Sequence, residues 1–298
     1  MNENNDVAKW LKKIEETFTG PSGVIGERGL LLQQKEKYNY EYLITQFKGY
    51  VRLMDAFFDF IIDTLNNISI NKETKDKEML AFSTSLQIIT FWRFRASYNI
   101  FWQGYFIDAL SLLRSVLETT FQIAALEVNV IKLDDIFGNL RKNMFEEMSE
   151  EAIKRILNTN LSKTDKKVND YLYGPASGLS PDAQDDIKSL IFILHNAVHK
   201  SRLNVALYYG PWARGEKHMP IFPEYDEDAA TCYMNDSQFI GWMIVKSLFL
   251  LRDDSFPGDW MKKFTILDES FKFAIAGFKK RTGRSIEELI LKKFTFTK

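Results

Sequence analysis

The fold class is decided by residues 104–127, which read GYFIDALSLLRSVLETTFQIAALE. At about 100° per residue, the polar side chains of this stretch gather within an arc of roughly 140°, and the remaining surface is almost wholly apolar. This pattern predicts a long helix that begins after Gly104 and ends near Glu127. The preceding stretch, from about Glu78 to Tyr98 or beyond, predicts a second long helix. We expect the two helices to pack antiparallel.

The rest of the chain shows the same helical periodicity, and no strand-like alternation with hairpin turns is present. Helices are predicted over residues 7–18, 40–65, 181–209, 226–252 and 258–280, with a short last helix after Ser285 and shorter, more polar helices within 131–174. We therefore predict an all-α helical bundle of roughly eight to ten helices with long central antiparallel helices. Residues 1–298 are expected to form a single domain, with a helical appendage over 1–28 and a less regular insert over 131–178.

Composition and charge exclude several classes of protein. The formal net charge is -1, from 39 basic and 40 acidic residues, so we expect no strong DNA binding and no attraction to an anionic membrane. Cys232 is the one cysteine, which excludes a disulfide framework. The uncharged stretch from Met79 to Trp92 is shorter than the ~20 residues of a membrane span, and the N-terminus does not resemble a signal peptide. These features predict a cytoplasmic protein that does not enter a membrane.

Seven residues of the 104–127 helix form one polar stripe on it: Asp108, Ser111, Arg114, Ser115, Glu118, Thr119 and Gln122. Exposed helix faces usually have several long charged side chains, whereas this stripe has short hydroxyl groups and no lysine, which favours a partly buried position. Arg114 and Glu118 are spaced to pair along the helix, and Arg93 or Arg95 is the expected partner from the preceding helix. The stripe is then either a structural network or a functional site.

A second polar group consists of His195, His199 and Arg202, which share one edge of a predicted helix. Three interpretations stay open: histidines satisfied at the edge of the core, a metal-free catalytic or ligand-binding role, and a metal site completed by His218 or Glu118. No His-Glu-x-x-His signature is present, and the nearby arginine disfavours a dication, so no cofactor is predicted.

Arginine and aromatic residues alternate from Trp92 to Tyr98. Such a pattern could stack on single-stranded nucleic acid, but with only two arginines in an apolar helix it favours buried packing of the aromatic rings with paired arginines.

Residues 109–118, ALSLLRSVLE, and residues 195–201, HNAVHKS, together resemble an uncharacterised group of prokaryotic and phage helical proteins. That group has an Arg-Ser-x-x-Glu helix and a later Val-His-x-Ser helix. The resemblance implies a helical bundle related in architecture to the HEPN class, whose members often act as ribonucleases in defence and toxin systems.

The two polar groups are expected to face each other inside the bundle and to form one pocket. In that hypothesis His195 or His199 acts as general acid or base, Glu118 orients it, and Arg114 or Arg202 stabilises a phosphate. RNA or nucleotide phosphodiester cleavage is the expected reaction. The alternative is a non-enzymatic helical sensor or scaffold that binds a partner protein or a second copy, and the third interpretation is a metal-binding bundle on the histidines.

Overall fold

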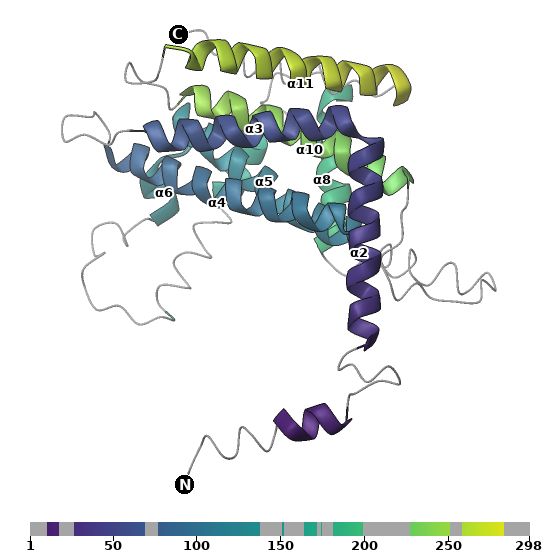
Figure 1. Cartoon of the computed structure of the whole chain (residues 1–298). Coiled ribbons are helices and arrows are strands. Elements are labelled where there is room, and N and C mark those ends of the chain that lie inside the picture. The colour runs from purple at the N-terminus through teal and green to yellow at the C-terminus, as the bar shows by residue number, and fades with distance from the viewer. Residues whose placement is uncertain are drawn as a thin grey trace.

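The computed structural model of the chain describes residues 11–17, 27–68, 77–137, 151, 164–171, 174, 181–198, 227–250 and 258–282. All regular elements within these ranges are helices, which confirms the all-α class (Figure 1). The main helices are α2 (Glu27–Gln46), α3 (Lys48–Asn67), α4 (Lys77–Trp102), α5 (Phe106–Glu127), α6 (Leu133–Phe137), α8 (Pro181–Val198), α10 (Glu227–Leu250) and α11 (Trp260–Thr282). Residues 11–17 and 164–171 are also helical.

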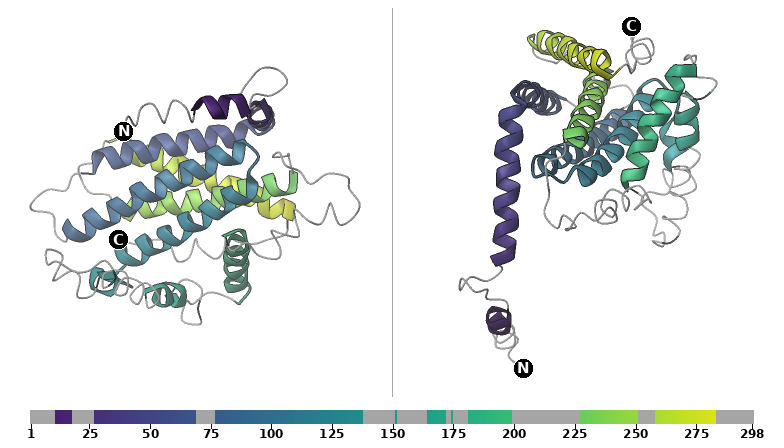
Figure 2. Two further views of the ribbon diagram at one scale, coloured as in Figure 1. Left: turned by 90° about the horizontal axis from the view of Figure 1, so that it is seen from below. Right: turned by 90° about the vertical axis from the view of Figure 1, so that its right-hand side faces the viewer.

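The helices form two layers. In the left view of Figure 2, α3, α4 and α5 lie side by side, and α10 and α11 lie behind them. Helix α10 packs against α3, α5 and α11, while α8 packs against the outer side of α5. None of the described helices is long and apolar enough to cross a lipid bilayer.

Helices α4 and α5 are the antiparallel pair at the centre of the bundle. Gly104 lies in the short connection between them with a φ of 95°, a conformation that glycine adopts without steric cost. Ser97 donates to the carbonyl of Ala109 at 2.7 Å, and Arg93, one turn earlier on α4, donates to Ser115, further along α5, at 2.6 Å. The contacts therefore run in opposite directions along the two helices, and the antiparallel prediction is confirmed.

Aromatic side chains fill the space between the layers. The ring centroid of Phe57 on α3 lies 5.3 Å from that of Phe94 on α4 and 5.6 Å from that of Phe271 on α11. Phe101 stacks on Tyr233 with 4.1 Å between the ring centroids. Buried apolar residues from α2 to α11 form one contiguous cluster in the described part of the chain. Ile131, Leu133, Ile136 and Val168, from the region predicted as a less regular insert, belong to that cluster.

The prediction of one helix over 40–65 was wrong. Helix α2 begins earlier, at Glu27, and the chain turns at Phe47, whose φ of -113° and ψ of 40° are not helical. Helix α2 then points away from the layer formed by α3, α4 and α5 (Figure 1). Its C-terminal half is held by Asn39, which donates to the carbonyl of Gln103 at 3.1 Å. Hydrophobic periodicity does not reveal such a turn, because the apolar pattern continues through it.

Other predicted boundaries agree with the structure where it describes them. Helix α8 begins at Pro181, α10 runs from Glu227 to Leu250 within the predicted 226–252, and α11 begins two residues after the predicted 258. The predicted continuation to residue 209 and the short helix after Ser285 lie outside the described residues.

Candidate functional site

Helix α5 places the polar stripe opposite its buried face. Leu113, Val116, Leu117 and Phe121 are buried, and Arg114, Glu118 and Gln122 line a cleft together with residues of α8 and of the helix 164–171. The short hydroxyls are satisfied on their own helix: Ser111 donates to the carbonyl of Ile107 at 2.9 Å, and Thr119 donates to that of Ser115 at 2.8 Å. This local bonding allows small polar residues to sit under neighbouring helices.

The stripe is partly buried, although unevenly. Thr119 is buried, Ser111, Arg114, Ser115 and Gln122 are half-buried, and Asp108 and Glu118 are exposed. The side chain of Arg114 is 18% exposed to solvent, and that of Glu118 is 54% exposed. The middle of the stripe therefore lies at the edge of the bundle and not within it.

Arg114 connects Glu118 to His195. Its Nε and Nη2 atoms each lie 2.8 Å from Oε1 of Glu118, one turn further along α5. Its Nη1 atom contacts Nδ1 of His195 in the last turn of α8. Because a guanidinium only donates hydrogen bonds, Nδ1 is the acceptor and the proton of the neutral imidazole lies on Nε2. Arg114 thus brings two other predicted site residues, Glu118 and His195, together.

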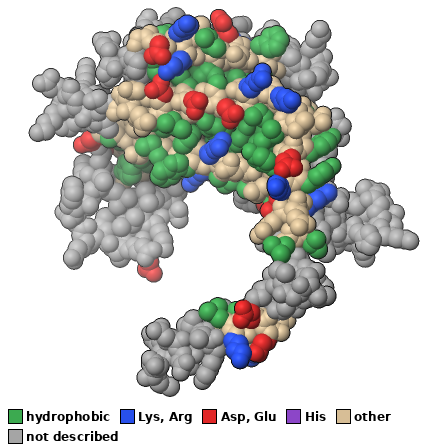
Figure 3. Space-filling view, in the orientation of Figure 1, with side chains coloured by type: hydrophobic (Ala, Val, Ile, Leu, Met, Phe, Trp, Pro, Cys, Tyr) green, Lys and Arg blue, Asp and Glu red, His purple; other side chains and the backbone are tan. Residues whose placement is uncertain are grey.

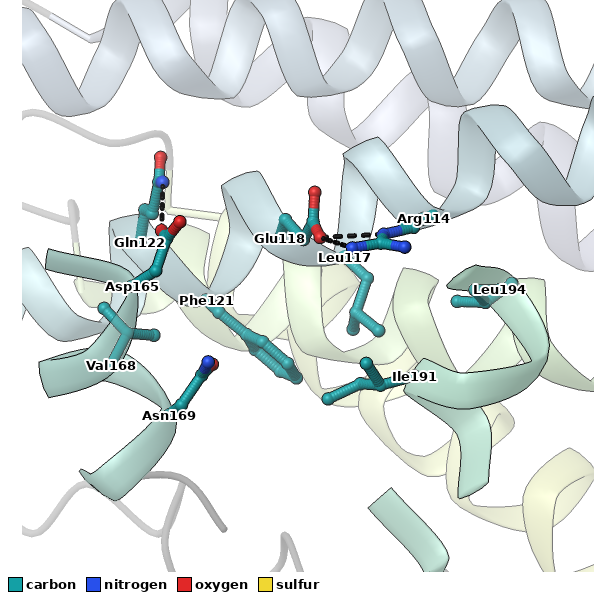
Figure 4. A pocket seen from close by; sticks show the side chains of 10 residues that line it. All are labelled: Arg114, Leu117, Glu118, Phe121, Gln122, Asp165, Val168, Asn169, Ile191 and Leu194. Carbon is teal, nitrogen blue, oxygen red and sulfur yellow. Dashed lines mark hydrogen bonds and ion pairs between the residues drawn. The ribbon is translucent and has the colours of Figure 1, made fainter. Parts of the chain in front are cut away.

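A cleft of about 380 Å³ lies beside this arginine (Figure 4). Its floor is apolar and comes from three elements, with Leu117 and Phe121 on α5, Val168 on the helix 164–171, and Ile191 and Leu194 on α8. Its polar wall consists of Arg114, Glu118, Gln122, Asp165 and Asn169. An apolar floor with a few converging polar groups is the usual composition of a small-molecule site.

The carboxylate of Asp165 lies at the far end of the cleft from Arg114. The amide of Gln122 approaches it at 3.5 Å, and Figure 4 shows the two side chains pointing toward each other. Burial raises the pKa of Asp165, and the negative charge of Glu118 raises it further. Arg114 and the two carboxylates give the cleft one positive and two negative charges.

The structure changes two details of the predicted pocket. The stripe and the histidine helix do meet, but they meet at the surface, since His195 and Glu118 are both exposed. The expected partners of the Arg114–Glu118 pair, Arg93 and Arg95, lie elsewhere. Arg93 donates to Ser115, and Arg95 lies over the rings of Phe58 and Tyr98 at 4.8 and 5.4 Å. The contact from another helix comes instead from His195.

His199, Arg202 and His218 lie outside the described residues. Within the described ranges, no three His, Cys, Asp or Glu side chains gather closely enough to share a metal ion.

The predicted burial of the aromatic rings from Trp92 to Tyr98 is confirmed only in part. Phe94 and Tyr98 are buried, but Trp92 is 64% exposed, and Arg93 and Arg95 on either side of it are exposed as well. The prediction of buried packing was therefore wrong for Trp92.

Asp165 and Asn169 are the cleft residues that the sequence did not single out. They line the cleft together with Val168, at the i, i+3, i+4 spacing of one helix face. A helix was predicted over this segment, so the spacing was visible, but nothing in the sequence indicated which helix this face would meet.

No protein-family model, no curated protein and no solved structure matches this chain.

Proposed function

We propose that this chain cleaves a phosphodiester of RNA or of a nucleotide at the site formed by Arg114, Glu118 and His195. One observation supports the proposal above the others: Arg114 brings a carboxylate and an imidazole from two different helices together beside an open cleft. A base, a hydrogen-bond donor and a cation within reach of one another are the groups that phosphodiester cleavage needs.

Each residue has a distinct role in this proposal. Only Oε1 of Glu118 is bonded to Arg114, so Oε2 removes the proton from the attacking hydroxyl or water. Arg114 has five N–H groups, of which three serve Glu118 and His195 among the described residues, and the other two bind phosphate oxygens. His195 accepts from Nη1 of Arg114 and so orients the guanidinium toward the phosphate. The P–O bond to the leaving oxygen then breaks, and that oxygen takes its proton from solvent at this exposed site.

The exposed indole of Trp92 also supports a ligand with a nucleobase. An exposed tryptophan beside two arginines provides a stacking surface and phosphate contacts. Arg93 donates to Ser115, the residue after Arg114 on α5. Glu78 is the one acidic residue of α4, so the helix itself presents no carboxylate near Trp92.

The test uses labelled single-stranded RNA together with linear and cyclic dinucleotides, with products separated on denaturing gels. We expect cleavage by the wild type and a loss of about 100-fold or more in Glu118→Gln and His195→Ala. Asp108→Asn, which removes one charge from the same helix at an exposed position, serves as the control and keeps full activity. Trp92→Ala weakens binding of the RNA by about tenfold. Cleavage that is equal in the wild type and Glu118→Gln would exclude this site as the reaction centre.

A non-enzymatic helical sensor or scaffold is the second candidate function. The observation that favours it is the same arginine, because its Nη1 joins α5 to α8 while two further N–H groups are occupied by Glu118 on α5. In this case Glu118→Gln and His195→Ala lower the thermal stability, and no cleavage occurs in the wild type or in any variant.

A further inference from the structure

A groove of about 690 Å³ runs between α3 and α11, two helices that do not line the cleft of Figure 4. The α3 side carries Gly49 and Ala56, two small residues two turns apart, and a Cβ added at Gly49 would have no atom within 4 Å. The α11 side carries Ile266 and Phe273. The small side chains on one wall leave room for a bulky side chain from outside.

Phe273 and Ile266 are exposed to an unusual degree. Phe273 is 83% exposed and Ile266 is 53% exposed, and both line the groove. Figure 3 shows hydrophobic side chains in green along the boundary between α11 and α3. A large apolar side chain beside an apolar groove is typical of a surface that is covered by a partner.

The charges at the groove indicate which partner fits. Arg52 on α3 and Glu269 on α11 both line it, and among the described residues neither forms an ion pair. A strongly acidic or strongly basic partner would satisfy one of these charges and repel the other. A two-fold axis that runs along the groove, in contrast, brings the α3 wall of each copy to the α11 wall of the other and so places opposite charges together twice.

We propose that this groove is the contact surface of a two-fold symmetric homodimer. Phe273 of each copy enters the groove of the other beside Gly49, and Arg52 pairs with the partner's Glu269. The proposal does not depend on the proposed function, since the cleft lies on other helices.

Sedimentation equilibrium of the full chain over a range of micromolar concentrations tests the proposal. The wild type is expected to have twice the mass of the 34.8 kDa chain. Phe273→Asp should weaken the dimer by about 100-fold and give a monomer, because the anchor is replaced by a charge. Phe192→Asp on α8, which changes a phenylalanine that is also highly exposed, should leave the dimer intact.

Charge reversal distinguishes the two-fold arrangement from other contacts. Arg52→Glu and Glu269→Arg should each weaken the dimer, and the double variant should restore it. All these positions are exposed, so circular dichroism should show folded variants. A wild type that stays at 34.8 kDa at every concentration, or a dimer unaffected by Phe273→Asp, would overturn the proposal.

Discussion

Substitution of Arg114 separates the structural contribution of this residue from its proposed chemistry. Its pair with Glu118 lies along one helix and faces solvent, so it contributes only about 0.3 to 0.5 kcal/mol. Its contact with His195 joins two helices and contributes about 0.5 to 1.5 kcal/mol. Arg114→Ala should therefore lower the free energy of unfolding by about 1 to 2 kcal/mol, measured by urea denaturation with helical circular dichroism.

A double-mutant cycle isolates the contact between the helices. Arg114→Ala and His195→Ala should show a coupling of about 1 kcal/mol, because each substitution alone removes the same contact. Lys262→Ala, at an exposed position of α11, is the control and should change stability by less than about 0.5 kcal/mol. A coupling near zero would refute the inference that Arg114 links α5 to α8.

Arg114→Lys then tests the proposed chemistry. Lysine keeps the positive charge but loses the forked N–H groups, so it cannot hold Glu118, His195 and a phosphate together. We expect phosphodiester cleavage to fall by about 100-fold while the free energy of unfolding changes by less than about 1 kcal/mol. Full activity in Arg114→Lys would exclude forked phosphate binding by this residue.

Three further predictions concern stability. Glu127 has a buried oxygen with no hydrogen-bond partner among the described residues, and burial raises the pKa of this carboxyl group above 4.5. The stability that Glu127 contributes to the folded state is therefore present below pH 4.5 and is lost as the pH rises. Glu127→Gln should stabilise the protein at pH 7 but not at pH 4. Hydrogen bonds from Lys246 and Lys272 outweigh the burial of Asp268 and lower its pKa below 3.8, so Asp268→Asn should cost about 2 to 3 kcal/mol at pH 7, and this cost should shrink as the pH falls from 3.8 through the lowered pKa. Gly241→Ala places a Cβ 3.0 Å from the Phe271 ring and should cost about 1 kcal/mol.

Urea denaturation at several pH values measures the two titration effects, and each prediction has a clear contrary result. Equal stabilisation by Glu127→Gln at pH 4 and pH 7 would contradict the assigned sign. A pH-independent loss in Asp268→Asn would show that charge is unimportant there. Gly258→Ala is the control for Gly241→Ala, since a Cβ added there has no atom within 4 Å, and it should change stability by less than about 0.5 kcal/mol.

The sequence alone determined the helical class and most helix boundaries. Periodicity at 3.6 residues is a local property, so α4, α5, α8, α10 and α11 could all be predicted from the apolar faces that they must bury. The composition of the α5 stripe also predicted a partly covered face around Arg114, because residues that are short and locally bonded suit such a position.

Only the tertiary structure decided which faces meet. The turn at Phe47, the approach of the helix 164–171 to α5, and the choice of His195 over Arg93 as the second partner of Arg114 all depend on contacts between segments far apart in the chain. Periodicity shows that a helix has an apolar face but not which neighbour covers it. For the same reason, the exposure of Trp92 and Phe273 could not be foreseen from the sequence.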